Sequence, residues 1–296
     1  MPLRSTSITL LADNCAVQDL RAEHGLSFFI EKEHATILFD TACDNTLLYN
    51  AGSLGVDLSL TEMLVLSHGH YDHTGGVADV LSLAPNANVY LHPAAFKERY
   101  SIRNETAKPT SMPDHARSAI FNLPQQQIHR VIKPTMLCSG IGLTGPIPRL
   151  TSFEDPGGPF FLDTNGKQPD LIDDDLSLWI ESENGLIIVT GCCHAGLINT
   201  IRSIVEFTGE KRIAALIGGF HLSTASPERL EKTVKELKQY DIRQIVPCHC
   251  TGKNATDYLA QFLDCPVEAG YAGLKLIISC MDSRLIRSNV SRKAFR

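Results

Sequence analysis

The sequence has no hydrophobic run approaching the ~20 residues that a membrane-spanning helix needs. Its start leads into a strand pattern and lacks the long apolar stretch of a secretory signal. It also has no excess of basic residues, since 27 Lys and Arg against 33 Asp and Glu give a formal charge of −6. That balance excludes a general electrostatic attraction to nucleic acid or anionic membrane. We expect a cytoplasmic protein with a small-molecule substrate and no nucleic-acid or membrane partner; a homo-oligomer stays open.

Paired cysteines are missing as well. The nine cysteines are odd in number, so complete internal pairing is impossible, and their spacing shows no zinc-ribbon framework. Reduced thiols in a cytoplasmic protein are the simplest account, and we expect Cys248 and Cys250 to be packing residues. The motifs G-x-G-x-x-G, Walker A and G-x-S-x-G are absent. The chemistry must therefore come from other residues.

The composition is that of a globular protein: 296 residues, 43% hydrophobic and 20% charged. Strand and helix patterns alternate in both halves of the chain. We expect strands at 7–11, 27–31, 35–40, 63–66, 89–92, 177–181, 186–190, 213–217, 244–246 and 274–279, and helices at 44–54, 76–83, 198–207, 227–240 and 255–263. Hairpins, such as the one indicated by Asn184-Gly185, alternate with helical crossovers. This mixture favours an α/β fold, an αββα sandwich of two mixed β-sheets with helices on both outer faces, over a doubly wound parallel sheet.

We expect a single domain over residues 1–282. The polar segment 99–127 contains three prolines and is typical of an insertion or lid, and the segment 154–172 is typical of a linker or active-site loop. Residues 283–296 carry five basic side chains and are interpreted as a solvated tail. The aromatic residues of these segments either line a ring-binding pocket or pack the insertion against the core. They are Phe96, Tyr100, Phe121, Phe160 and Phe161.

One short segment concentrates metal-binding side chains. His68, His70, Asp72 and His73 lie within six residues, directly after the buried strand pattern 63–66. Side chains two residues apart on an extended backbone point the same way, so His68 and His70 can bind one ion together. The turn that follows lets Asp72 and His73 face a second ion. Imidazole suits zinc, iron or nickel, and the carboxylate extends the choice to manganese.

His68-Gly69-His70-Tyr71-Asp72-His73 resembles the HxHxDH signature of the metallo-β-lactamase superfamily, whose fold is an αββα sandwich. Phe39-Asp40-Thr41 resembles the early strand end of that family, whose Asp buttresses the metal loop. Four further passages, 23–27, 191–196, 218–222 and 247–252, resemble one branch of it. That branch contains the dihydropterin-type synthase of the methanopterin pathway and many metal-dependent hydrolases.

The resemblance implies a dinuclear centre of two divalent metal ions, zinc first, with iron or manganese as alternatives. The implied ligands are His68, His70 and His194 for the first ion and Asp72, His73 and His249 for the second. Where the family usually presents a bridging Asp, this chain has Cys192. Either the Cys192 thiolate or one of Asp173, Asp174 and Asp175 replaces that bridge. Asp40 and His24 are expected to orient ligands.

The expected function is that of a metal-dependent hydrolase, which uses metal-activated water on a small anionic substrate such as a phosphoester or lactone. Asp72 would orient the nucleophile, and His221 would deliver a proton or stabilise an anion. Resemblance to the pterin branch implies an alternative, a transferase with a diphosphate leaving group. A non-catalytic metal-binding sensor is the third hypothesis, because the bridging acid is missing. β-Lactamase activity is disfavoured.

Overall fold

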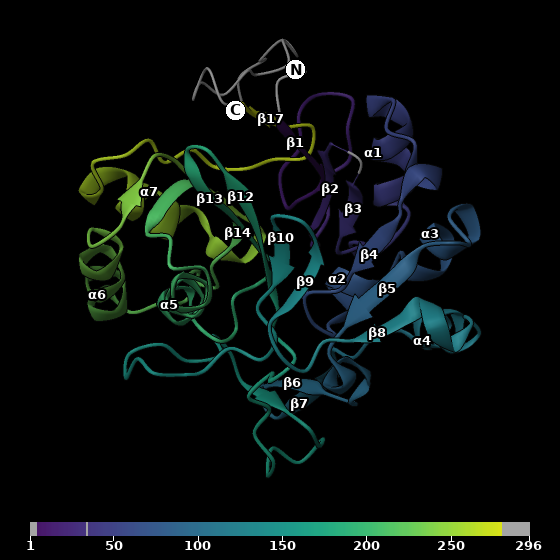
Figure 1. Cartoon of the computed structure of the whole chain (residues 1–296). Coiled ribbons are helices and arrows are strands. Elements are labelled where there is room, and N and C mark those ends of the chain that lie inside the picture. The colour runs from purple at the N-terminus through teal and green to yellow at the C-terminus, as the bar shows by residue number, and fades with distance from the viewer. Residues whose placement is uncertain (1–4, 34, 280–296) are drawn as a thin grey trace.

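Two seven-stranded β-sheets pack face to face in the computed structural model, which describes residues 5–33 and 35–279 (Figure 1). The first sheet contains, in spatial order, β17 (Lys275–Ile278), β1 (Thr6–Ala12), β2 (Ser27–Lys32), β3 (Ala35–Phe39), β4 (Met63–Val65), β5 (Asn88–Leu91) and β8 (Ile128–Arg130). The second contains β15 (Asp241–Ile242), β14 (Arg212–Gly219), β13 (Gly185–Thr190), β12 (Ser177–Ser182), β10 (Ile141–Leu143) and β9 (Thr135–Cys138), and β16 (Ile245–Cys248) pairs with β14.

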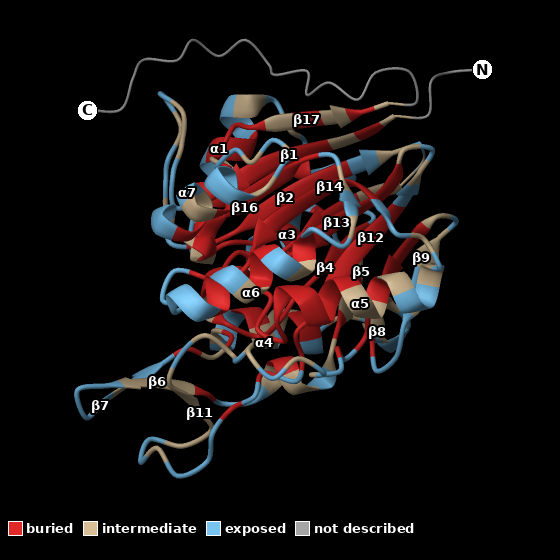
Figure 2. Ribbon diagram, turned by 90° about the vertical axis from the view of Figure 1, so that its left-hand side faces the viewer, coloured by how far each residue is buried: buried red, intermediate tan, exposed pale blue. Residues whose placement is uncertain are grey.

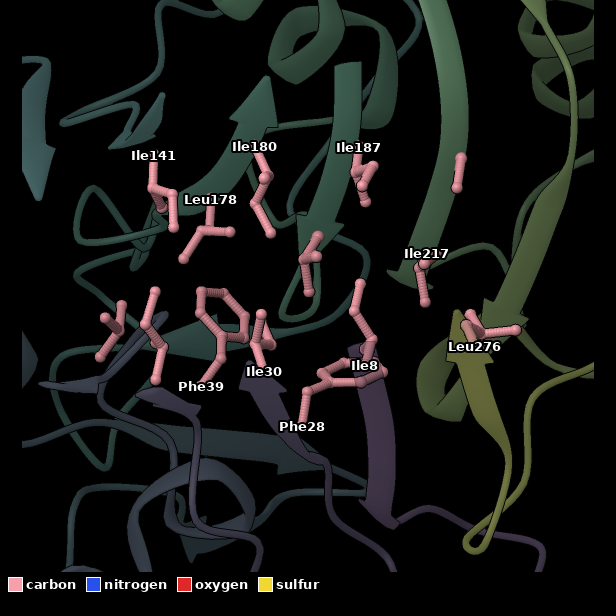
Figure 3. Close-up of a cluster of buried hydrophobic side chains, with 14 of the residues drawn as sticks. Ile8, Phe28, Ile30, Phe39, Ile141, Leu178, Ile180, Ile187, Ile217 and Leu276 are labelled. Carbon is pink, nitrogen blue, oxygen red and sulfur yellow. The ribbon is translucent and has the colours of Figure 1, made fainter. Parts of the chain in front are cut away.

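Apolar side chains from both sheets fill the space between them. Ile8, Phe28 and Phe39 on the first sheet face Leu178 and Ile187 on the second (Figure 3). Successive side chains of a strand point to opposite faces of its sheet, so the outer face of each sheet also needs cover. Helices provide it: Figure 1 shows helices outside each of the two sheets, and Figure 2 shows the strands as largely buried. The predicted αββα sandwich is confirmed.

Helices on the two outer faces bury separate apolar clusters. The first sheet is covered by α1 (Thr46–Leu54), α3 (Val77–Leu83) and α4 (Asp114–Phe121), and the second by α5 (Leu197–Thr208), α6 (Pro227–Leu237) and α7 (Lys253–Phe262). Across residues 5–33 and 35–279, the structure has no helix with both the length and the apolar character to cross a membrane.

The expected strands and helices are present, with ends that differ by at most three residues. The Asn184-Gly185 hairpin joins β12 and β13 as predicted. Four short strands of the two large sheets, β8, β9, β10 and β15, were not predicted. The tail at 283–296, and with it the predicted domain end at 282, lies outside the described residues.

The segment 99–127 is two different structures rather than one lid. Its first part forms the hairpin of β6 (Tyr100–Arg103) and β7 (Thr106–Pro109), and β11 (Phe160–Phe161) pairs with β6. We call these three strands the arm; it extends from the sandwich (Figure 2). The second part contains α4, whose Ala116 and Ile120 are buried in the helical layer. The helix therefore belongs to the core, because it covers the first sheet.

The parallel strand pairs bring several strand ends to one edge. β3, β4 and β5 are parallel in the first sheet, and β13, β14 and β16 are parallel in the second. Their carboxyl ends lead directly into the segments that contain the predicted ligands. Three of the residues after these ends, Asp40, His221 and His249, have left-handed φ angles of 61°, 46° and 47°. Such strained backbone is typical of functional sites.

Candidate metal centre

The loop that follows β4 is held by buried polar contacts. Asp40 accepts hydrogen bonds from the Ser67 backbone N–H (2.7 Å) and hydroxyl (2.6 Å) and lies 2.7 Å from His73 Nδ1. Gly69 donates its N–H to Asp174 Oδ2 (2.7 Å). A Cβ at Gly69 would lie 2.0 Å from the Ala95 carbonyl oxygen, so this close approach requires glycine.

His68, His70 and His194 form the first group of candidate ligands. Their ring centroids are 4.5 to 5.0 Å apart. His68 Nε2 lies 2.9 Å from His70 Nδ1, and two nitrogens that bind one zinc ion at about 2.0–2.1 Å lie roughly 3 Å apart. His194 comes from the loop after β13, so the first group joins the two sheets.

Asp72, His73 and His249 form the second group. Asp72 Oδ2 lies 3.3 Å from His249 Nε2 and 3.8 Å from His73 Nε2. His24 Nε2 is also 3.2 Å from this oxygen, although the His24 side chain is 60% exposed. Ligand atoms of His24, Asp72 and His249 converge as a set, so His24 stands beside Asp72 itself rather than behind another ligand.

Cys192 lies between the two groups. Its sulfur converges with ligand nitrogens of His68 and His194, and equally with those of His73 and His249. The Cys192 Sγ to His73 Nε2 distance is 3.1 Å. The residue at the usual position of the bridging acid therefore sits where a bridge between two ions would be.

Four histidines are oriented so that Nδ1 faces the protein and Nε2 faces the centre. Nδ1 of His73 donates to Asp40, Nδ1 of His194 to the Pro156 carbonyl (2.7 Å), and Nδ1 of His249 to Asn14 Oδ1 (2.8 Å). His68 Nδ1 likewise lies 2.9 Å from the Ser67 hydroxyl, whose own hydrogen is donated to Asp40. Such contacts fix the tautomer and leave Nε2 free to bind a metal.

The donor set fits a metal ion. The Nε2 atoms of His70, His194 and His249 are buried and have no hydrogen-bond partner. Buried nitrogen atoms without a partner are costly, and a divalent ion in each group would satisfy those of His194 and His249. Burial lowers the pKa of His68 and His194 well below its usual value, and that of His70 to about 3. These imidazoles are therefore neutral at pH 7, as metal binding requires.

The second group is charged. Burial alone would lower the pKa of His73, but the Asp40 and Asp72 carboxylates raise it to about 9. Burial alone would raise the pKa of Asp72, but the three histidines around it hold that pKa well below its usual value. Burial raises the pKa of the Cys192 thiol well above its usual value, so without a metal this sulfur is protonated.

His221 stands at the edge of the first group. Its ring lies 4.4 Å from that of His194, and its Nδ1 is buried without a hydrogen-bond partner. Burial lowers the pKa of His221 to about 4. A Cβ at Gly157 would lie 2.0 Å from His221 Nδ1, so this glycine lets the loop pack on the ring.

The three acids upstream of β12 lie elsewhere. Asp173 is exposed. Asp174 binds Gly69 N–H and Arg99, and Asp175 Oδ2 accepts the Ala195 N–H (2.7 Å). None of the three belongs to a set of converging ligand atoms in the described chain. Cys192, rather than one of these acids, lies against both groups of candidate ligands.

Several site residues gave no recognisable signal in the sequence. Asn14 and the Pro156 carbonyl contact ligands that are distant in the chain, and a backbone carbonyl has no sequence signature. Cys250, expected to be a packing residue, lies with its sulfur 3.7 Å from the Cys192 carbonyl oxygen. Its position after β16, beside His249, was the available clue.

Comparison with known proteins agrees with this geometry. The family model of the metallo-beta-lactamase superfamily matches residues 20–199. The chain is 31% identical over 262 residues to the 7,8-dihydropterin-6-methyl-4-(beta-D-ribofuranosyl)-aminobenzene-5'-phosphate synthase of Methanocaldococcus jannaschii. That alignment covers 85% of this chain and 89% of the synthase.

Solved structures give the same result. The crystal structure of Tm1679, a metal-dependent hydrolase of the beta-lactamase superfamily, has a TM-score of 0.80 and 32% identity, covering 93% of this chain and 99% of that one. The metallo-beta-lactamase fold protein YhfI from Bacillus subtilis has a TM-score of 0.56 at 11% identity, covering 93% and 99% of the two chains. At that identity, the second likeness shows the fold alone.

Proposed function

Because the chain belongs to the metallo-beta-lactamase superfamily, we propose that it is a metal-dependent hydrolase of a small anionic substrate such as a phosphoester. The observation that supports this most is the convergence of four histidines on the Cys192 sulfur, two of which, His194 and His249, have a buried Nε2 without a hydrogen-bond partner. A purely structural cluster would satisfy these nitrogens with hydrogen bonds. The cluster instead has the donor set of a metal centre.

We assign two divalent ions, zinc by preference, to the two groups. His68, His70 and His194 would hold one, Asp72, His73 and His249 the other, and Cys192 would lie between them as a thiolate. Divalent ions bound here would lower the pKa of a coordinated water and offset negative charge that develops on the substrate. Iron or manganese would fit the same nitrogen and carboxylate donors.

Two residues of the chain, Asp72 and His221, would carry out the remaining steps. Asp72, ionised and surrounded by three histidines, would accept a hydrogen bond from the attacking water and orient it. His221, neutral at pH 7, would hold an anionic oxygen of the substrate or pass a proton to the leaving group. The close packing of Gly157 would keep its ring in place.

A transferase is the second candidate, favoured by the 31% identity to a dihydropterin-type synthase along most of both chains. In that reaction the same centre would stabilise a diphosphate leaving group while an arylamine attacks a pterin methyl group. The two candidates differ in one requirement. A hydrolase needs water alone, whereas a transferase needs an acceptor.

The test measures metal content and turnover on the same preparations. We expect close to two ions per chain and hydrolysis of bis(p-nitrophenyl) phosphate that is lost with a chelator and restored by Zn²⁺ or Mn²⁺. His194→Ala should lose metal and activity. His129→Ala is the matched control, because that imidazole contacts Asn88 and Tyr90 instead of the centre.

Two results would contradict the proposal. Turnover that appears only when an arylamine acceptor is added would favour the transferase. Absence of metal from the wild-type chain, with no turnover under either condition, would leave a non-catalytic protein.

A further inference from the structure

One aromatic side chain of the arm lies at the metal centre. The Phe160 ring centroid is 5.0 Å from that of His70, 5.4 Å from that of His194 and 6.1 Å from that of His221. Phe160 is only partly buried, so its ring is in reach of a bound molecule. It therefore stands beside the first group and beside His221.

We propose that Phe160 determines substrate specificity by selecting molecules that carry a planar ring next to the anionic group. The inference rests on the proposed function, because it takes the metal centre as the place where the anion binds. An aromatic side chain favours a ring at stacked or edge-to-face distances over an alkyl group of similar size. With the anion at the metal ions, the next group of the substrate would meet the Phe160 ring.

The backbone around Phe160 is fixed on both sides. Its N–H donates to the Gly158 carbonyl (3.0 Å), and its carbonyl accepts the N–H of Asp170 (2.9 Å). In the arm, Phe160 is paired with Ser101 of β6. A Cβ at Gly158 would lie 2.7 Å from the Phe160 ring, so that glycine leaves room for the ring in this orientation. These contacts hold the Phe160 ring in place before a substrate binds.

A buried ionic network connects Phe160 to the metal loop. Asp170, whose N–H binds the Phe160 carbonyl, lies with Oδ2 3.1 Å from Arg99 Nε. Arg99 in turn makes two contacts to Asp174, at 2.7 and 3.1 Å. Asp174 accepts the N–H of Gly69, between the two histidines of the metal loop. The network therefore fixes the distance between Phe160 and the first group.

The neighbouring Phe161 offers a matched control. Successive side chains of a strand point to opposite faces, and Phe161 faces Gly166 and Ile102 within the arm instead of the metal centre. A Cβ at Gly166 would lie 3.7 Å from the Phe161 ring and 3.4 Å from Ile102. Phe161→Leu thus removes the same ring from the same strand without touching the site.

The experiment titrates zinc-loaded protein with phenylphosphonate and with n-hexylphosphonate, whose alkyl group has the same number of carbons, in a calorimeter. Neither probe is hydrolysed, so the readout is independent of turnover. We expect wild type to bind phenylphosphonate about fivefold to tenfold more tightly than n-hexylphosphonate. Phe160→Leu should reduce that preference to less than about twofold, Phe160→Tyr should restore it, and Phe161→Leu should leave it unchanged.

Each other outcome overturns the inference. Equal binding of the two phosphonates by wild type, or no binding of phenylphosphonate, shows that no ring is selected. A Phe160→Leu protein that loses zinc and binds both probes equally weakly shows that the ring only shields His70. The two proposals fail separately. A ring preference without hydrolysis refutes the hydrolase, and hydrolysis without a ring preference refutes the role of Phe160.

Discussion

The first and second groups of candidate ligands lie side by side and share Cys192, yet they differ in charge. The first group consists of His68, His70 and His194, whose pKa values are all lowered by burial. The second group combines the ionised Asp72 with His73, whose pKa is raised to about 9 by the Asp40 and Asp72 carboxylates. One group is neutral, and the other is an ion pair.

This difference indicates how each group would meet a cation. Asp72 and Asp40 compensate part of the charge of an ion in the second group. The first group supplies neutral nitrogen alone, so charge there must be compensated by a deprotonated Cys192 or by the substrate. An anionic substrate would accordingly be drawn to the first group, beside Phe160 and His221. We therefore expect the second group mainly to hold its ion and the first group to bind the substrate.

The largest effect is expected from Asp72→Asn, which keeps the side-chain shape but removes the carboxylate that three imidazoles face. We expect kcat/KM for bis(p-nitrophenyl) phosphate to fall by more than about a hundredfold, with loss of an ion from the second group. Asp40→Asn, which disturbs ligands only indirectly, through His73 and through the Ser67 hydroxyl beside His68, should cost about tenfold to a hundredfold.

The exposed Asp173→Asn is the control for the same chemical change, and it should behave as wild type. Equal losses in Asp72→Asn and Asp40→Asn would contradict the comparison, because Asp72 would then have no role beyond holding its neighbours.

The parts of the fold that were predictable are those with a local signal. The pattern of β13, an apolar run after Asn184, identified the strand that ends at Thr190, directly before Gly191 and Cys192. The unpredicted strand β10 has only three residues, and one of them is Gly142. A Cβ there would lie 2.3 Å from the Trp179 ring, so the residue is set by tertiary packing and not by strand propensity.

In the candidate site, too, some residues have a local sequence signal and others are set by tertiary contacts. Dense motifs identified His68, His70 and the loop around them, since ligands two residues apart share a face. The contact of Asn14 with His249 joins positions 235 residues apart, one after β1 in the first sheet and the other after β16 in the second, and the packing of the two sheets brings them together. Long-range contacts of this kind leave no periodicity in one sequence.

Cys192→Ala is expected to have the next largest effect, because this sulfur lies against both groups. We predict that the affinity for Zn²⁺ falls by about tenfold to a hundredfold at both groups, measured by competition with a chromophoric chelator. Cys193→Ala is the matched control, since that buried thiol lies 3.6 Å from the Thr200 hydroxyl. Loss of affinity at one group only would place Cys192 in that group and remove it from the bridging position.

The smallest effect concerns the pH dependence of folding stability in metal-free protein. Burial raises the pKa of Asp175, behind the first group, and of Asp13, behind His249, to about 7 from 3.8. A raised carboxyl pKa gives stability that is complete below pH 3.8 and is lost as pH rises through 7. Each of these two carboxyls then lowers the free energy of unfolding by about 1.4 kcal/mol per pH unit between pH 3.8 and 7.

Buried histidines with lowered pKa values, such as His70 and His194, titrate in the same window with the opposite sign, so the prediction concerns the difference from wild type. Asp175→Asn should raise the slope of the unfolding free energy against pH by about 1.4 kcal/mol per pH unit between pH 4 and 6.5, while exposed Asp173→Asn should preserve the wild-type slope; urea unfolding at several pH values measures both. The ion pair of the second group acts in another window, because the raised pKa of His73 gives stability that is lost only between about pH 6.5 and 9. The Asp175→Asn protein should keep that alkaline loss. If the substitution changed the slope in both windows, the two groups would titrate as one unit, and the separation of a neutral group from a charged one would be wrong.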